Sequence, residues 1–289
     1  MSIGPILQLD NGHVSVRIAV RGAELKSLRH RGRELIWKGD PAWWDYSAPL
    51  LFPVIGRLHD GRIRHEGNVL ALPPHGFARE LPFTVVRATS VGTELRLRAS
   101  PETLAIYPFD FELNVSFKLS GRELAQHVCI VNRGTTPMPA SFGFHPGFCW
   151  PVRKPDRAAH SIHFTDPESI SAFGIDATGR LVNRARLLEI HERRLALDDS
   201  LFSDGAIVLN PVRSNGLAYW DQGGPLLSLR WAGCGQLGLW TLPGAPFVCI
   251  EPWHGHPSPM GFSGSLLEKP GGFVLQPGHM KRFALAIAV

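Results

Sequence analysis

The sequence predicts an all-β protein, a large antiparallel β-sandwich in which residues 1–289 form a single domain. Apolar and polar residues alternate with period 2 in several segments, which is typical of half-buried antiparallel strands. Helical periodicity is poor, and the 30 glycines and 24 prolines help to separate short strand-like runs. No shift in composition marks a domain boundary, and all-β domains often reach about 200–250 residues as one unit.

The expected strands follow from this alternation. Val14, Val16, Ile18 and Val20 share one face of the first clear strand, and residues 109–119 alternate in the same way. Further short strands are expected at 94–99, 124–132, 206–209, 217–220, 226–231, 236–240, 247–251 and 283–289. Residues 186–201 are the best helical candidate, but their charge and short length favour a loop with a helical turn.

Charge and composition argue against several partners. The net charge is +5, but the basic residues are scattered and form no run interleaved with aromatics, so no nucleic-acid partner is expected. No basic-then-apolar leader opens the chain, and glycine and proline interrupt its longest uncharged stretch at 231–250, so no membrane segment is expected. The four cysteines lie far apart without a CxxC pair, which favours reduced thiols in a cytoplasmic protein.

The motifs of nucleotide, zinc-protease and serine-hydrolase sites do not occur in the sequence. His254 and His256 offer two imidazoles, but no third ligand stands at a sensible spacing, so no metal is expected. Cys149 follows His145 closely, yet a buried structural thiol is the favoured interpretation. The prediction is a protein without a cofactor.

Three segments place ionisable side chains in apolar surroundings. Glu251 ends the apolar run Phe247-Val-Cys-Ile, where burial would raise its pKa and suit a general base; a structural ion pair with an arginine is the open alternative. His145 lies among phenylalanines and suits a general acid, with a hydrogen-bonded core histidine as the alternative. His75 and Arg79 share a loop bounded by proline and glycine, where surface capping is the simpler role.

Together these segments resemble a known family. The motifs Pro74-His-Gly-Phe-Ala-Arg79, Gly143-Phe-His-Pro-Gly-Phe148 and Cys249-Ile-Glu-Pro-Trp253, in this order, resemble the aldose 1-epimerases (galactose mutarotases), especially the shorter bacterial branch. The resemblance covers most of the chain, and Phe52-Pro-Val-Ile-Gly-Arg57 belongs to it. It implies the galactose mutarotase-like supersandwich with a sugar cleft on one face.

The resemblance also implies roles for single residues. Glu251 matches the family's catalytic base and His145 its catalytic acid, while His75 matches a histidine that contacts the sugar near the ring oxygen. The implied reaction is the interconversion of α and β anomers of a free aldohexose by ring opening and reclosure. It needs neither metal nor nucleotide.

Substrate contacts carry over less directly. Arg57 is the closest match to a substrate-binding arginine, with Arg62 and Arg79 as competitors, and Asp204 matches an acidic residue that binds sugar hydroxyls. Trp253 is a candidate for stacking on a sugar face.

One departure from the family pattern is Gly147, which stands where an aromatic residue usually follows His-Pro. The alternatives are a hexose-6-phosphate mutarotase and a carbohydrate-binding or sensing module without turnover. The expected partner is a monosaccharide, and the expected state is a monomer or homodimer.

Overall fold

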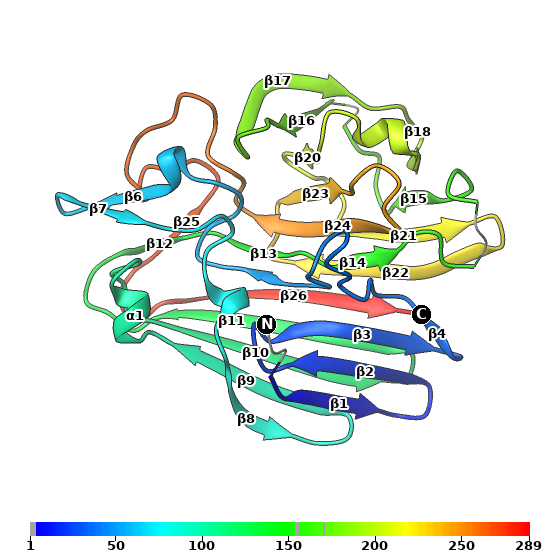
Figure 1. Cartoon of the computed structure of the whole chain (residues 1–289), viewed down its shortest axis with the longest axis horizontal. Helices are drawn as coiled ribbons and strands as arrows, with labels where there is room; N and C mark the ends of the chain where they lie inside the picture. The colour runs from blue at the N-terminus through cyan, green and yellow to red at the C-terminus, as the bar shows by residue number, and fades with distance from the viewer. Residues whose placement is uncertain (1–3, 154–155, 170) are drawn as a thin grey trace.

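The computed structural model describes residues 4–153, 156–169 and 171–289 and is built largely of antiparallel strands (Figure 1). It confirms the prediction of an all-β protein with large antiparallel sheets. Three large sheets carry most of the strands. None of the helices in the described residues is long and apolar enough to cross a membrane.

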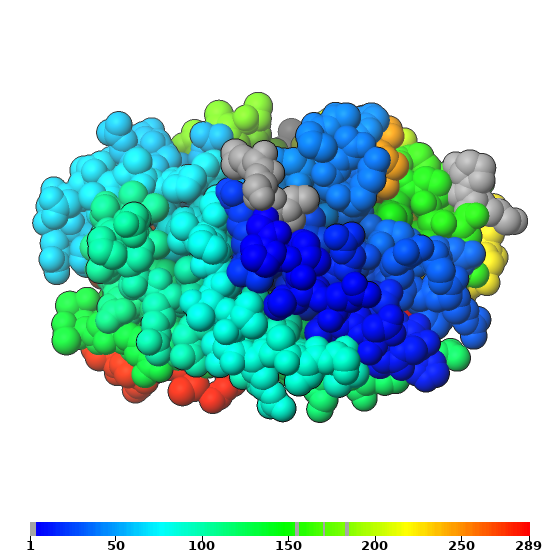
Figure 2. Space-filling model, turned by 60° about the horizontal axis from the view of Figure 1, so that its bottom comes forward, coloured from blue at the N-terminus to red at the C-terminus, as the bar shows by residue number. Residues whose placement is uncertain are grey.

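The N-terminal sheet has four strands in sequential order. They are β1 (Ile6–Asp10), β2 (Val14–Ala19), β3 (Glu24–His30) and β4 (Arg33–Glu34). Figure 2 shows a face of the molecule on which this part of the chain, in dark blue, lies beside the light-blue residues that follow it.

The second sheet has ten strands. In spatial order they are β18 (Ile190–His191), β19 (Arg194–Ala196), β15 (Ser161–Phe164), β21 (Gly216–Asp221), β22 (Gly224–Ala232), β26 (Met280–Ala288), β11 (Glu123–Asn132), β10 (Phe111–Ser120), β9 (Gly92–Arg98) and β8 (Thr84–Ala88).

The third sheet carries the candidate site. Its order is β17 (Leu181–Leu187), β16 (Ser171–Ile175), β20 (Ile207–Leu209), β23 (Gln236–Trp240), β24 (Phe247–His254), β13 (Phe142–Phe144) and β5 (Leu50–Leu51), and β14 (Gly147–Cys149) also pairs with β24.

Two small two-stranded sheets and single helical turns complete the fold. One sheet is the hairpin of β6 (Arg62–His65) and β7 (Asn68–Ala71), and the other pairs β12 (Met138–Ala140) with β25 (Phe273–Leu275), which lies far from it in the sequence. The turns are α1 (Pro101–Leu104), η1 (His59–Gly61), η2 (Ala78–Glu80) and η3 (Asp199–Phe202).

The alternation of the sequence fixes which face of each strand is buried. In β10, the side chains of Leu113, Val115, Phe117 and Leu119 lie in the main core. Lys118, between the last two, is exposed. Side chains from all three large sheets meet in that core, for example Val16 of β2 and Leu239 of β23. A shared core of this kind is what joins stacked sheets into one folded unit.

The segment 186–201 contains no long helix. It finishes β17, forms the short β18–β19 hairpin and ends in the single 3₁₀ turn η3. The Asp198 side chain caps this turn by accepting a hydrogen bond from the Leu201 N–H at 3.1 Å. The predicted helical turn is therefore present, and short strands take the place of much of the predicted loop.

Candidate active site

A cavity of about 290 Å³ lies against β24 and the loops that face it. It lies near the lower end of the size range of small-molecule pockets, about 300–1,000 Å³. Its lining combines ionisable groups with aromatic rings: Trp44, His75, Arg79, His145, Ile175, Asp176, Gly205, Ala206, Trp240, Glu251 and Trp253. These residues lie far apart in the sequence, so only the folded chain assembles this surface.

Strand β24 places Glu251 at the cavity. Because side chains alternate along a strand, Val248 and Ile250 face the main core while Glu251 and Trp253 face the other way. Glu251 is only 1% exposed. Its strand neighbour is Gly238 of β23, which has no side chain to compete for the space beside the carboxyl group.

His145 lies in the turn between β13 and β14, which both pair with β24. Its Nε2 atom is 3.1 Å from Oε2 of Glu251. The imidazole stacks on Trp44, with ring centroids 4.9 Å apart. The β24 pairing and the Trp44 ring therefore hold an acid–base pair in one orientation.

Burial controls the protonation of this pair. It raises the pKa of Glu251 well above the usual range of a carboxyl group. It also lowers the pKa of His145 well below the usual range, and neighbouring His75 and Arg79 act in the same direction. Both shifts disfavour the charged forms, so burial favours a neutral carboxyl group beside a neutral imidazole.

His75 presents a defined donor to the cavity. Its Nδ1 atom accepts a hydrogen bond from the Gly56 N–H at 3.2 Å, which leaves the proton of the neutral ring on Nε2. Burial, aided by the charge of Arg79, lowers the pKa of His75 to about 3. At neutral pH the ring is therefore an uncharged N–H donor.

Arg79 is the cavity-lining member of the three candidate arginines. Its Nη2 group donates to the Pro74 carbonyl at 3.1 Å, and its guanidinium lies 4.6 Å from the Tyr46 ring centre. Arg57 is exposed and packs its stem on Gly179, and Arg62 begins β6 with an exposed side chain. Arg57, which matches the family's substrate-binding arginine, therefore lies outside the cavity lining, whereas Arg79 is part of it.

A similar difference concerns the acidic residue. Asp204 is exposed and does not line the cavity, although the following residues, Gly205 and Ala206, do. The lining carboxylate is Asp176, at the end of β16, which accepts the Thr178 N–H at 2.9 Å and the Arg180 N–H at 3.0 Å. These hydrogen bonds hold Asp176 in its turn. A hydrogen bond from the Thr178 hydroxyl, followed by those from the two backbone N–H groups, lowers the pKa of Asp176.

Trp253 forms a buried wall of the cavity. Its indole fills the space above two glycines, so that a Cβ atom at Gly143 would lie 2.5 Å from Trp253 Cδ1 and one at Gly238 would lie 2.6 Å from Cζ2. Both positions therefore require glycine. Trp253 is 2% exposed, so a sugar contacts at most the edge of this ring.

The departure at Gly147 has a structural explanation. A Cβ atom there would lie 2.9 Å from Cζ3 of Trp44. Trp44, supplied by the loop before β5, thus fills the space above Gly147 and stacks on the neighbouring His145. Sequence reasoning missed Trp44, Asp176 and Trp240; the glycine at 147 was the one signal that could have pointed to Trp44.

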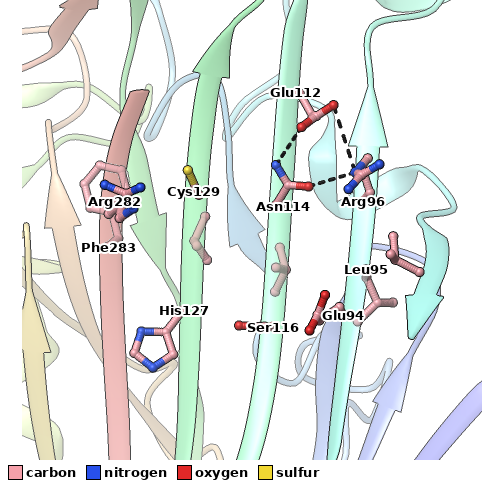
Figure 3. A pocket seen from close by; sticks show the side chains of 13 residues that line it. Glu94, Leu95, Arg96, Glu112, Asn114, Ser116, His127, Cys129, Arg282 and Phe283 are labelled. Atoms are coloured by element: carbon pink, nitrogen blue, oxygen red, sulfur yellow. Dashed lines mark hydrogen bonds and ion pairs between the residues drawn. The ribbon is translucent and has the colours of Figure 1, made fainter. Parts of the chain in front are cut away.

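A larger hollow of about 580 Å³ lies on the ten-stranded sheet, over β9, β10, β11 and β26 (Figure 3). There Asn114 and Arg96 form a polar network with Glu112. No carboxyl–imidazole pair within ion-pair distance occurs among the described residues that line it. The smaller cavity on β24 is therefore the candidate active site, because its groups can move protons.

Comparison with known proteins identifies the family. The family model for aldose 1-epimerase matches residues 5–187. The chain belongs to the aldose 1-epimerase family, as its motifs predicted. Among curated proteins, the chain is 28% identical over 277 residues to the plasmid-encoded protein LacX of Lactococcus lactis, covering 91% of this chain and 92% of LacX.

Solved structures agree with this assignment. A galactose mutarotase related enzyme from Lactobacillus acidophilus superposes with a TM-score of 0.91 at 26% identity, covering 98% of this chain and 97% of that one. A galactose mutarotase-like protein from Lactobacillus casei gives 0.91 at 27% identity, with 98% and 99% covered. The fold is thus the galactose mutarotase-like supersandwich, and the family supports a mutarotase-type epimerase activity.

Proposed function

We propose that this protein interconverts the α and β anomers of a free aldohexose, with Glu251 as general base and His145 as general acid. One observation carries the proposal: Nε2 of His145 and Oε2 of Glu251 lie 3.1 Å apart, and both residues line the same cavity. The hydroxyl oxygen O1 and the ring oxygen of an aldose are both bonded to C1. Two adjacent proton-transfer groups can therefore exchange protons with both oxygens of one sugar at the same time.

The chemistry follows from the positions of the side chains. A proton first passes from the Glu251 carboxyl group to His145, which leaves a carboxylate and an imidazolium. Glu251 then takes the proton of O1 while His145 delivers its proton to the ring oxygen, and the C1–O5 bond opens to the aldehyde. Rotation about C1–C2 and the reverse transfers close the ring from the other face. The Nε2–H of His75 and the guanidinium of Arg79 stabilise charge that develops on the ring oxygen.

The lining also supports an uncharged substrate. Arg79 is the one arginine or lysine among the described lining residues, and its Nε lies 3.4 Å from the Glu80 carboxylate. Asp176 and Glu251 add acidic groups that accept hydrogen bonds from sugar hydroxyls.

We further propose that residues 1–289 act as one domain, since the three sheets share a core. The cytoplasmic location stays a prediction.

A second candidate is a mutarotase of phosphorylated hexoses. Arg57 packs on Gly179, and Arg180 extends from the same turn with Nη1 3.3 Å from His59 Nδ1. Both arginines therefore flank the turn that carries the cavity residue Asp176. This arrangement favours a phosphate group that projects from the cavity.

The test is the rate at which freshly dissolved α-D-glucose, α-D-galactose and α-D-glucose 6-phosphate reach anomeric equilibrium, followed by polarimetry or proton NMR. The proposal expects acceleration with a free hexose and its loss in His145→Asn. The matched control is His127→Asn, which removes a histidine from the larger hollow and retains the wild-type rate. Acceleration with the phosphate alone would establish the second candidate, and sugar binding without turnover would establish a binding module.

A further inference from the structure

The thiol of Cys249 lies beside the acid–base pair and has no part in the mechanism above. Cys249 precedes Glu251 by two residues in β24, so both side chains lie on the same face of the strand. One ligand atom from each of Cys249, Glu251 and His145 falls within 4.8 Å of the other two, and all three residues are buried. Among the described residues, these three form the one group of three or more potential metal ligands with this spacing.

The pair itself has the spacing of two ligands on one metal ion. Zinc binds nitrogen and oxygen ligands at about 2.0–2.2 Å with tetrahedral angles, which separates two such ligands by about 3.3 Å. The observed Nε2–Oε2 distance is 3.1 Å. Oε2 of Glu251 is buried and has no hydrogen-bond partner among the described residues, so its lone pairs are available to a cation.

We propose that His145, Cys249 and Glu251 form an inhibitory binding site for zinc or a similar thiol-binding divalent cation. The cation binds both members of the acid–base pair. Cys249 is 0% exposed, and its sulfur completes the ligand set from inside the protein. Because His145 and Glu251 line the cavity, water or a sugar hydroxyl from the cavity could complete a tetrahedral ligand set.

Charge balance favours such a complex in a buried place. The thiol releases its proton to solvent when it binds the metal, and any proton on the carboxyl group leaves as well. The thiolate and the carboxylate together carry two negative charges, which the divalent cation neutralises. No oxidation or reduction takes place. Metal binding occupies both proton-transfer groups and therefore stops mutarotation.

The other residues considered as metal ligands in the sequence do not form a comparable site. Nδ1 of His254 bonds to the Gly233 carbonyl at 2.8 Å, and Nδ1 of His256 bonds to the Pro257 carbonyl at 2.7 Å. Cys149 is half-buried on β14 and its thiol contacts the Ile36 carbonyl at 3.3 Å. Cys149 is thus a natural control for Cys249.

The experiment titrates the purified full chain with cadmium chloride and zinc chloride. Cadmium is followed by the ultraviolet charge-transfer band of a cadmium–thiolate bond, and zinc by calorimetry. Wild type and Cys149→Ser are expected to bind one equivalent with equal affinity and to show the thiolate band. Cys249→Ser, checked for folding by circular dichroism and repeated as Cys249→Ala, is expected to lose the band and to bind at least tenfold more weakly.

Mutarotation is then measured with and without zinc, each protein relative to its own metal-free rate. Inhibition of wild type that disappears in both Cys249 variants supports the proposal. A thiolate band that persists in the Cys249 variants, or zinc affinity equal to wild type, would overturn it. The band and the stoichiometry need no sugar turnover, so failure of the proposed mutarotase function leaves this test intact and separate.

Discussion

Two buried glutamates in the same protein show how surroundings decide the use of a carboxyl group. Glu112 of β10 is 4% exposed and Glu251 of β24 is 1% exposed. Arg98 and Arg133 donate to Glu112 at 2.8 and 3.0 Å, and Asn114 adds a further hydrogen bond. Glu251 instead faces the imidazole of His145, with Nε2 at 3.1 Å from Oε2.

Their pKa values move in opposite directions. The hydrogen bond from Asn114, followed by those from Arg133 and Arg98, outweighs burial and lowers the pKa of Glu112 to about 2. Burial without a cation raises the pKa of Glu251 well above the usual range. A carboxylate saturated with donors stabilises the fold, whereas one that faces a titratable imidazole and no cationic donor can exchange protons.

The largest expected effect is a difference in activity between variants of Glu251 and of Glu112. Glu251→Gln keeps the shape of the side chain but removes the base, and we expect kcat to fall by about 10²–10⁴-fold while sugar binding persists. Glu112→Gln is the matched control, and its kcat should stay within about twofold of wild type. Anomer exchange by NMR measures both. Comparable losses in the two variants would break the comparison.

Next in size is the stability that Glu112 contributes. Glu112→Gln loses charge-assisted hydrogen bonds, each worth about 1.5–3 kcal/mol, and should lower the free energy of unfolding by about 2–3 kcal/mol at pH 7. Because the folded-state pKa of about 2 lies below the ordinary 4.5, the contribution is complete above pH 4.5 and is lost as the pH falls towards 2. Urea unfolding of both proteins from pH 7 to 3 tests this, and a constant difference would contradict it.

A third prediction extends the comparison to a buried cation. Lys269 is 6% exposed, its Nζ donates to the His256 carbonyl at 2.5 Å, and burial lowers its pKa to about 7. The unfolded chain, with an ordinary lysine, binds more protons than the folded chain above pH 7. Stability should therefore rise with pH, and this group should add about 2 kcal/mol between pH 7 and 9.

Lys269→Met isolates the effect of this lysine from other titrations. The variant should lack this part of the rise, whatever its absolute stability. Equal slopes for the two proteins in chemical unfolding at pH 7, 8 and 9 would show that the Lys269 ammonium is not destabilised in the folded state.

The smallest expected effect concerns Glu80, a carboxylate that is only partly buried. It accepts hydrogen bonds from Tyr46 and from Arg21, the latter at 2.7 Å, and lies beside Arg79. Tyr46→Phe removes one hydrogen bond and keeps the ring beneath Arg79. We expect KM to rise by about two- to fivefold with kcat unchanged, since partly exposed pairs contribute about 0–1 kcal/mol. Unchanged KM would show that Arg79 needs no help from this network.

The sequence allowed the long strands to be predicted because their residues alternate over many positions. The prediction at 236–240 coincides with β23, and that at 109–119 overlaps most of β10. Short strands such as β13 (Phe142–Phe144) escaped prediction, since three residues contain too little alternation and their structure depends on pairing with β24.

The residues of the candidate site divide in the same way, into those that the sequence could predict and those that it could not. Glu251, His145 and His75 stand in recognisable motifs, and the fold brings them together around one cavity. Asp176 and Trp44 lie in connecting segments with no repeating pattern, and their positions depend on loop conformations that local sequence does not reveal. Arg57 matched a motif, yet its side chain is exposed and does not line the cavity.

The way Trp44 occupies the space above Gly147 has an evolutionary consequence. The two positions divide a single volume beside His145, so a bulky residue can enter at only one of them. Relatives that carry an aromatic residue after His-Pro should have a small residue at the position of Trp44. Exchange between these states requires two coupled substitutions, and each single intermediate either crowds the histidine or leaves its ring without support.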